Sequence, residues 1–221
     1  MRHELVVLDD AEAVAQAAAE RVAAAAADAV RDRGAFSIAV SGGRSPWAMF
    51  GELAHLDVPW ESVEVYQVDE RVAPAGDPQR NLVHLEEALG PQLPVQVHPM
   101  PVEADDLERA ARDYAGALPA TIDVIHLGLG ADGHTASLVP GDPILAVDDR
   151  LVAVTGGLYQ GTLRMSLTYP ALARCRRLLW LVTGEDKRDA LAQLLAADPS
   201  IPAGRVEAPA SLVLADRAAA G

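Results

Sequence analysis

The sequence predicts an α/β fold: a doubly wound, mainly parallel sheet with helices on both faces, giving three layers in a single domain over residues 1–221. Short runs rich in Val and Ile alternate with helical segments along the whole chain, the pattern of strand–helix–strand units. Half of the residues are apolar and 23% are charged, the composition of a folded domain. No internal repeat or linker divides the chain.

The first predicted helix has recognisable signals at both ends. It spans Ala11–Arg33, follows a strand at Glu4–Leu8, and is rich in alanine, the residue with the highest helix propensity. Asp9 or Asp10 can cap its N-terminus, and Gly34 suits the left-handed position that ends many helices.

Apolar runs predict the later strands, and the stretches between them predict helices. The loop at Pro74–Asn81 follows from its Pro, Gly and Asp content. The remaining strands are expected at Phe36–Val40, Val63–Val68, Val95–His98, Val124–Leu127, Leu151–Thr155, Leu163–Leu167 and Leu178–Thr183. The remaining helices are expected at Leu82–Leu89, Asp105–Leu118 and Glu185–Ala197.

The turn after the strand Val124–Leu127 is the strongest functional signal. It reads G-L-G-A-D-G-H-T-A-S-L-V-P over Gly128–Pro140 and presents Asp132 and His134 among three glycines. Glycine lets the backbone approach a ligand closely, and ligands bind at the strand ends of open α/β sheets. A carboxylate two residues before an imidazole is a candidate proton-handling pair. We therefore interpret His134 as functional rather than as a turn cap.

The same turn matches the dinucleotide-binding pattern G-x-G-x-x-G, with Asp148 and Asp149 about 20 residues further on. Two features count against that interpretation. Asp132 would put a carboxylate beside the pyrophosphate, and Pro140 would stop the helix that the fingerprint needs. No nucleotide cofactor is expected.

A second glycine-rich turn predicts an anion site. Ser41–Pro46 follows a strand, and Pro46 suits the first turn of a helix. Free N–H groups and the positive end of the helix dipole favour phosphate there. Lys187 on the first turn of a later helix is unfavourable unless an anion is bound, and Arg164 is expected to point to the same place. The candidate binding residues are Ser41, Gly42, Gly43, Arg44, Arg164 and Lys187.

Three charged residues, Asp69-Glu70-Arg71, follow the predicted strand Val63–Val68. Their position directly after a buried strand places a polar cluster at the strand's C-terminal edge. A surface ion pair would be worth little, so we interpret Asp69 and Arg71 as site residues.

Composition excludes several classes of partner. The net charge of -14 argues against nucleic acid, whose binders carry a basic footprint. Cys175 is the only cysteine and the histidines have no ligand spacing, so neither a disulfide nor a metal site is expected. The stretch Met1–Leu8 does not resemble a signal peptide and no apolar run approaches a membrane span, so we expect a cytoplasmic protein without a membrane partner.

Taken together, these stretches resemble the 6-phosphogluconolactonase family, within the glucosamine-6-phosphate isomerase/deaminase superfamily. The resemblance rests on the Ser41–Pro46 turn, on Asp69–Arg71 with Asn81 downstream, and on Gly128–Pro140. It extends to Arg164-Met165-Ser166-Leu167-Thr168 and to Val182-Thr183-Gly184-Glu185-Asp186-Lys187.

The resemblance implies a modified Rossmann-like sheet and hydrolysis of 6-phospho-D-glucono-1,5-lactone to 6-phosphogluconate, a step of the oxidative pentose phosphate pathway, without cofactor or metal. It implies His134 as general base and Arg71 as a partner of the reacting end. Asp132 is expected either to orient the imidazole or to bind a sugar hydroxyl, and the role of Asp69 is equally open. It also implies phosphate binding by Gly42, Gly43, Arg44 and Lys187, with Arg164 a weaker match.

Two departures from the family pattern are visible. Val72-Ala73-Pro74 stands after Asp69–Arg71, where the family often has a bulky or apolar residue followed by Val-Pro. Arg80 precedes Asn81, where the family commonly has a serine, and this change can alter how the substrate is held.

The alternatives are an amino-sugar-phosphate deaminase or isomerase, and a non-catalytic sugar-phosphate sensor. The deaminases carry a glutamate five residues after the histidine, in H-I-A-F-N-E-P, and here that position is Val139. They also tend to have a tyrosine at the position of Arg71. Sensors usually carry a helix-turn-helix, for which residues before Asp10 leave no room. The chain is expected to be a monomer or a small homo-oligomer.

Overall fold

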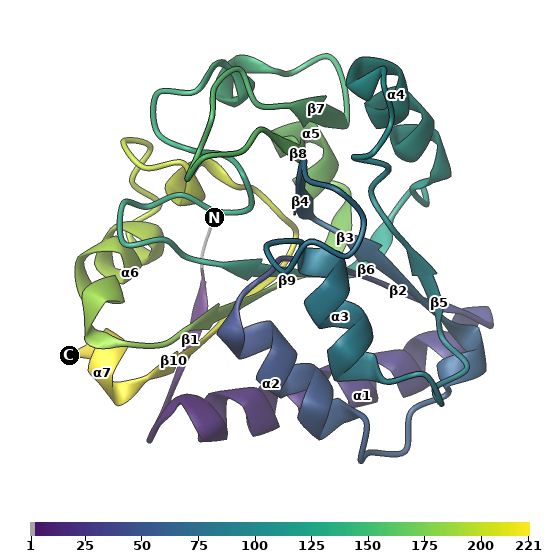
Figure 1. The fold of residues 1–221 in the computed structure, drawn as a ribbon. Helices are drawn as coiled ribbons and strands as arrows, with labels where there is room; N and C mark the ends of the chain where they lie inside the picture. Colours follow the sequence, from purple (N-terminus) through teal and green to yellow (C-terminus); the bar gives the residue numbers. More distant parts are fainter. Residues whose placement is uncertain (1–2) are drawn as a thin grey trace.

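The computed structural model describes residues 3–221, so Met1 and Arg2, part of the stretch considered for a signal peptide, lie outside it. Within that range, a seven-stranded sheet forms the centre of the molecule, and all of its neighbouring strands are parallel (Figure 1). Across the sheet the strands are β1 (Glu4–Leu8), β10 (Ser211–Asp216), β9 (Cys175–Val182), β6 (Ile122–Gly128), β2 (Phe36–Val40), β3 (Val63–Gln67) and β5 (Gln96–His98).

Helices cover both faces of this sheet and bury a separate apolar cluster on each. One face carries α1 (Ala11–Arg33), α2 (Arg44–Leu53) and α3 (Asn81–Leu89), seen below the sheet in Figure 1. The other carries α4 (Leu107–Ala117), α5 (Tyr169–Leu172), α6 (Arg188–Leu195) and α7 (Arg217–Ala220). The expected three-layer, doubly wound α/β fold is therefore confirmed.

Local sequence signals set the bounds of the first elements as expected. The Asp10 carboxylate caps α1 by accepting from the Ala13 N–H at 2.9 Å. Gly34 ends the helix at φ 83°, in the left-handed region that glycine occupies without strain. Strand β2 then follows with all five residues buried, and Ser37 is the one polar residue in this mainly apolar run.

A second, three-stranded antiparallel sheet corrects the expectation for Asp69–Arg71. These residues form β4, a strand in their own right, which pairs with β8 (Arg164–Leu167), and β8 pairs with β7 (Val152–Val154). The small sheet joins the large one through Val68, whose N–H donates to Val40 O and whose carbonyl accepts from Leu167. Three consecutive charges are unusual in a strand, and here they are accommodated by polar partners in a buried setting.

Two further differences lie in the last part of the chain. Strand β10 and helix α7 lie in a region for which no element is expected above, although the apolar run Leu212–Ala215 is typical of a buried strand. The expected helix Glu185–Ala197 is divided into a 3₁₀ turn at Glu185–Lys187 and the helix α6.

The order of the strands determines where a ligand can bind. From β2 the chain moves outward through β3 to β5, and it then returns to β6 and moves in the opposite direction through β9 to β10. The neighbouring strands β2 and β6 therefore form the switch point of the sheet. In open α/β sheets the crevice outside the carboxyl ends of such strands is the usual ligand site, and the two glycine-rich turns both begin there.

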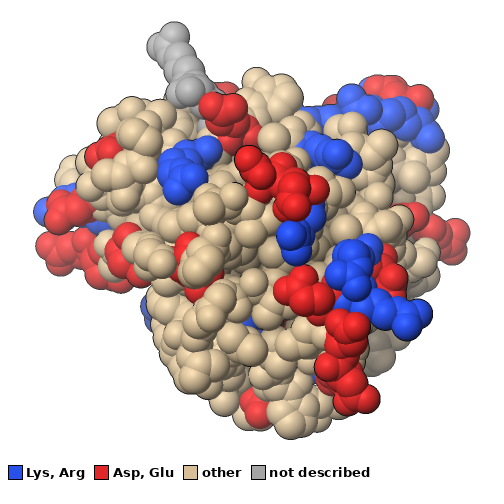
Figure 2. All heavy atoms as spheres, turned by 90° about the horizontal axis from the view of Figure 1, so that it is seen from above, with Lys and Arg blue, Asp and Glu red and all other residues tan. Residues whose placement is uncertain are grey.

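Charged side chains are interspersed on the face seen in Figure 2, where blue and red atoms lie next to one another. Ion pairs between exposed side chains include Arg109 with Asp113 and Arg150 with Glu108. Within residues 3–221, no helix is both long enough and apolar enough to cross a membrane.

Candidate active site

One cavity of about 300 Å³ lies at the switch point and gathers residues from both sheets. Of the ten predicted site residues, Asp132 alone does not line the cavity. Its carboxylate instead contacts Nδ1 of His134. The predicted residues that line the cavity are Ser41, Gly42, Gly43, Arg44, Asp69, Arg71, His134, Arg164 and Lys187.

The turn after β2 presents backbone N–H groups to the cavity. Gly43 caps α2 at φ 134° and ψ 170°, a conformation that favours glycine, and no side chain caps this end of the helix. The first N–H groups of a helix have no acceptor within it. Gly42 packs against Asn81 so closely that an added Cβ would lie 1.9 Å from the Asn81 Oδ1. The turn can therefore receive an anion at the helix N-terminus.

Two cations lie beside this turn. Lys187 is the only lysine of the sequence, and its Nζ pairs with Asp186 at 2.9 Å. The positive charge of Arg44 also lowers the pKa of Asp186, after the larger effect of the hydrogen bond from Lys187, which places both cations near one carboxylate. Ser45 and Thr183 connect the two segments by a hydroxyl contact of 3.2 Å.

At the end of β6, Asp132 and His134 form a hydrogen-bonded pair. Nδ1 of the imidazole lies 2.5 Å from Asp132 Oδ1, and the His134 N–H donates to the same oxygen at 3.1 Å. A Cβ on Gly130 would lie 2.0 Å from Nδ1, so only glycine permits this arrangement. Because Nδ1 is engaged by Asp132, Nε2 is the ring nitrogen left for the cavity.

The environment of Asp132 favours its ionised form. Partial burial alone would raise the pKa of this carboxyl. The hydrogen bonds from the ring and backbone of His134, together with the charge of the ring, outweigh burial and hold the pKa below its usual range. An ionised carboxylate at Nδ1 is the partner that orients an imidazole and leaves Nε2 free to accept a proton.

Asp69, at the start of β4, is almost completely buried at the edge of the cavity. Burial raises the pKa of its carboxyl, and the hydrogen bond from Ser137 Oγ at 2.7 Å, with the charges of Arg71 and Arg164, offsets this only in part. For the cationic Arg164, burial has the opposite sign and lowers the pKa, and the neighbouring charge of Arg71 lowers it further. The two guanidinium groups are therefore close to one another on one side of the cavity.

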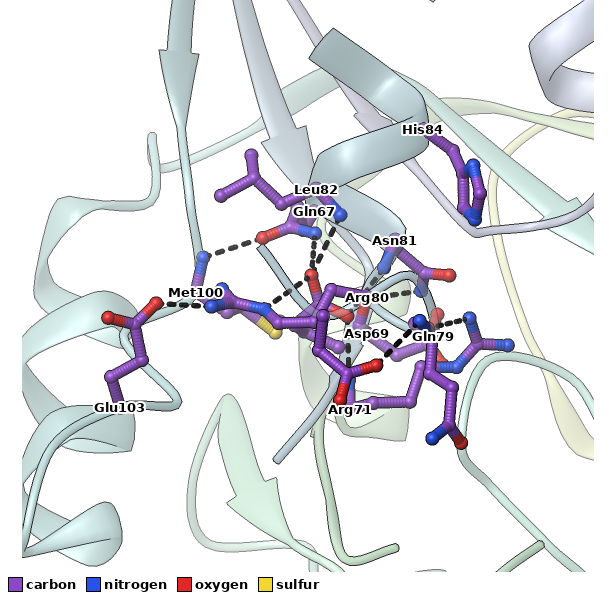
Figure 3. A network of polar contacts seen from close by, with 12 residues as sticks. Gln67, Asp69, Arg71, Gln79, Arg80, Asn81, Leu82, His84, Met100 and Glu103 are labelled. Carbon is purple, nitrogen blue, oxygen red and sulfur yellow. Dashed lines mark hydrogen bonds and ion pairs between the residues drawn. The ribbon is translucent and has the colours of Figure 1, made fainter. Parts of the chain in front are cut away.

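Glu70 organises a polar network next to these residues, and Figure 3 labels several of its members, among them Gln67, Asn81 and Leu82. Its fully buried carboxylate accepts hydrogen bonds from the Gln67 side chain at 2.9 Å and from the Arg71 N–H at 2.7 Å. It also accepts from the N–H groups of Asn81 and Leu82, each at 2.8 Å, at the start of α3. The carboxylate thus fixes both β4 and the N-terminus of α3.

Arg80, one of the departures from the family pattern, belongs to this network and does not line the cavity. Its side chain is buried, lies 3.5 Å from Glu70 and forms a hydrogen bond to Glu103, as Figure 3 shows. Arg80 therefore belongs to the buried network that holds β4 and α3 together, and it does not contact the cavity.

Two polar residues that line the cavity, Tyr159 and Gln160, lie outside every stretch that the sequence analysis singles out as functional. They lie on the connection between β7 and β8, whose Gly156-Gly157 pair marks a loop without indicating a ligand. No spacing or motif distinguishes them, because the antiparallel pairing of β7 with β8 brings them to the cavity.

Outside this cavity, Cys175 is buried, and burial raises the pKa of its thiol to about 11. Over residues 3–221 no group of three or more His, Cys, Asp or Glu side chains is arranged to hold a metal ion.

Comparison with known families and sequences identifies relatives over almost the whole chain. Residues 9–217 match the family of glucosamine-6-phosphate isomerases/6-phosphogluconolactonase. A 6-phosphogluconolactonase of Synechocystis sp. is 39% identical over 189 residues, covering 77% of each chain. A 6-phosphogluconolactonase of Mycobacterium tuberculosis is 34% identical over 242 aligned residues, covering 100% of this chain and 98% of the relative.

Solved structures show the same fold. The crystal structure of a 6-phosphogluconolactonase from Shewanella baltica superposes with a TM-score of 0.88 at 25% identity, covering 97% of this chain and 98% of the other. A monomeric glucosamine-6-phosphate deaminase superposes with a TM-score of 0.86, but at 19% identity, so it shares the fold. On the family match and these relatives together, the chain belongs to the 6-phosphogluconolactonase family, within the glucosamine-6-phosphate isomerase superfamily.

Proposed function

We propose that this chain hydrolyses 6-phospho-D-glucono-1,5-lactone to 6-phosphogluconate in the oxidative pentose phosphate pathway, with His134 activating the attacking water. The observation that carries the proposal is the Asp132–His134 pair facing the same cavity as the glycine turn Ser41–Pro46 and Lys187. The relatives named 6-phosphogluconolactonase support the choice of substrate.

In this proposal the phosphate group binds at the N-terminus of α2. Free N–H groups of the turn, with the charges of Arg44 and Lys187, hold the three phosphate oxygens. Because this end of the substrate is fixed, the lactone carbonyl is held beside His134. The free energy of phosphate binding is thus used to orient the reacting carbon.

His134 then acts first as a general base and afterwards as a general acid, with the same proton. Nε2 takes a proton from water as the oxygen attacks the carbonyl carbon, while ionised Asp132 stabilises the imidazolium through Nδ1. Arg71 stabilises the negative oxygen of the tetrahedral intermediate, a contribution of about 3 kcal/mol for one donor. When the intermediate collapses, the bond from carbon to the ring oxygen breaks and that oxygen receives the proton from Nε2.

The activity is tested by generating the lactone in situ from glucose 6-phosphate and comparing acid release with the spontaneous rate. Ammonia release from glucosamine 6-phosphate is measured in parallel, since the shared superfamily makes deamination the competing activity. The side chain of Val139, at the position of the deaminase glutamate, cannot accept a proton and does not line the cavity. Ligand-induced thermal stabilisation without any product would instead support a non-catalytic sensor.

We expect His134→Ala to lower kcat by at least about a hundredfold, because the general base is lost. Steady-state hydrolysis rates check this, and far-ultraviolet circular dichroism checks that the variant is folded. His55→Ala is the matched control, since His55 is exposed and lies outside the cavity. A His134→Ala variant with a wild-type rate would remove the imidazole from the mechanism.

Lys187→Ala is expected to raise KM about tenfold or more, the loss of a charge-assisted contact of about 1.5–3 kcal/mol, with a smaller change in kcat. Arg188→Ala changes the next side chain, which is exposed and points away from the cavity, and should leave both constants unchanged. An unchanged KM in the Lys187 variant would place the phosphate elsewhere.

A further inference from the structure

The connection between β7 and β8 contains a strained turn. The N–H of Tyr159 donates to Thr162 O at 2.9 Å, and the N–H of Thr162 donates back to Tyr159 O at 3.3 Å. Between them, Gln160 has φ 52° and Gly161 has φ 89°. Two successive left-handed residues form a type I′ turn, in which Gly, Asn and Asp are favoured and a glutamine is strained. Such strain often accompanies functional positions.

The turn holds Tyr159 against the cavity while its neighbour faces solvent. The side chain of Leu158 is 71% exposed, whereas Tyr159 and Gln160 line the cavity. The Asp142 carboxylate accepts from the N–H groups of Gly156 and Gly157, each at 3.1 Å, and fixes the start of the connection. Arg164 donates to Tyr159 O at 3.1 Å and lies 5.5 Å from the centre of its ring. Tyr159 is therefore fixed from both sides.

The ring of Tyr159 packs against the ring of His134. The ring centres are 5.3 Å apart at an interplanar angle of 64°, an edge-to-face contact. The phenol oxygen lies 3.4 Å from Nδ1, but Asp132 Oδ1 lies 2.5 Å from the same nitrogen. The Nδ1–H group therefore donates to the Asp132 carboxylate, with which it forms the shorter, charge-assisted hydrogen bond. The contribution of Tyr159 is therefore packing by its ring and not a hydrogen bond by its hydroxyl.

We propose that Tyr159 is a positioning residue for His134: its aromatic ring restrains the imidazole in the orientation that points Nε2 into the cavity. Gly130, where an added Cβ would lie 2.0 Å from Nδ1, has no side chain with which to restrain the ring. The proposal rests on the proposed function of His134 as general base. It concerns the orientation of the base and assigns Tyr159 no contact with the substrate.

The test compares Tyr159→Phe, Tyr159→Ala and the neighbouring control Leu158→Ala in the full chain. Tyr159→Ala should lower kcat about tenfold, the size of loss expected when a general base is displaced by less than about 1 Å. The same variant should change KM by less than about twofold. Tyr159→Phe keeps the ring and should retain kcat within about twofold. Leu158→Ala should match the wild type. Nitrogen-15 NMR of the His134 ring should show a fixed imidazole in the wild type and Phe variant, and line broadening in the Ala variant.

Four results would overturn the proposal: a Tyr159→Ala variant with wild-type kcat, a Phe variant as impaired as Ala, an effect on KM alone, or unchanged His134 ring signals in the Ala variant. The second would assign the function to the hydroxyl, and the third would make Tyr159 a substrate contact. If the wild-type chain does not hydrolyse the lactone, the proposed function fails, but the NMR comparison still decides whether Tyr159 restrains the ring.

Discussion

At the scale of single residues, two carboxyl groups on either side of the cavity have opposite electrostatic environments. Burial raises the pKa of Asp69, whereas hydrogen bonds from His134 outweigh burial and lower the pKa of Asp132. Ionisation of Asp69 therefore opposes folding, and ionisation of Asp132 favours it. Similar residues within one site thus contribute to stability with opposite signs.

We expect Asp69→Asn to raise the melting temperature at pH 8 while lowering hydrolytic activity. Between the unfolded-state pKa of about 3.9 and the higher folded-state pKa, the folded chain binds more protons, so wild-type stability falls as pH rises. The asparagine variant does not titrate there, so its advantage should grow from pH 4 upward. Calorimetric melting temperatures across this range check the sign.

Asp132→Asn provides the control of opposite sign. In the folded state the pKa of Asp132 is depressed, so its ionised carboxylate stabilises the wild-type fold above the unfolded-state pKa of about 3.9. This stabilisation is lost as pH falls through the folded-state pKa. This variant should melt below the wild type at pH 8, and the gap should close in acid. If both variants shift in the same direction, the electrostatic interpretation is wrong.

At the scale of elements, sequence signals predicted best where structure depends on neighbouring residues. The bounds of α1 follow from the Asp10 cap and the Gly34 terminus, and those of β2 follow from a short, mainly apolar run. The three charges of β4 predict a polar cluster at the end of a strand and not a strand of their own, because their partners in β8 and α3 are distant in sequence. For the same reason, the sequence pointed to His134 but not to Tyr159, whose place depends on how β7 pairs with β8.

The Glu70 network predicts a stability effect at the junction of β4 and α3. Glu70→Gln should lower the free energy of unfolding by about 3 kcal/mol, because it removes the buried charge partner of the buried Arg80. Glu103→Gln removes the exposed partner of the same arginine and should cost less than about 1 kcal/mol. Urea unfolding measures both. Equal effects would contradict the assignment of Glu70 as the anchor.

At the scale of the whole molecule, cations line the cavity of a chain whose net charge is -14. Under the proposed function, the net charge would repel the anionic substrate from a distance, while four cations that line the cavity, Arg44, Arg71, Arg164 and Lys187, would attract it at close range. Contacts of a few ångströms are shorter than the Debye length of about 8 Å at physiological salt, so the local attraction dominates once the substrate has entered.

We therefore expect KM for the phosphorylated lactone to rise several-fold between about 0.01 M and about 1 M salt, as the Debye length falls from about 30 Å to about 3 Å. The change in kcat should be smaller, because proton transfer by His134 creates no net charge. Unphosphorylated glucono-1,5-lactone serves as the control and should show little dependence. A falling KM would mean that repulsion by the net charge decides binding.

The attachment of the antiparallel sheet through Val68 has a consequence for the diversification of this fold. The imidazole and the glycine bend are carried by the large sheet, whereas Asp69, Arg71 and Arg164 arrive on the small one. Under the proposed function, substitutions at Arg164–Leu167 in the small sheet can thus alter which sugar is accepted while leaving the turn that carries His134 in place. A change of substrate preference is therefore best begun by exchanging Arg164–Leu167 between relatives, with Arg71 and Tyr159 kept.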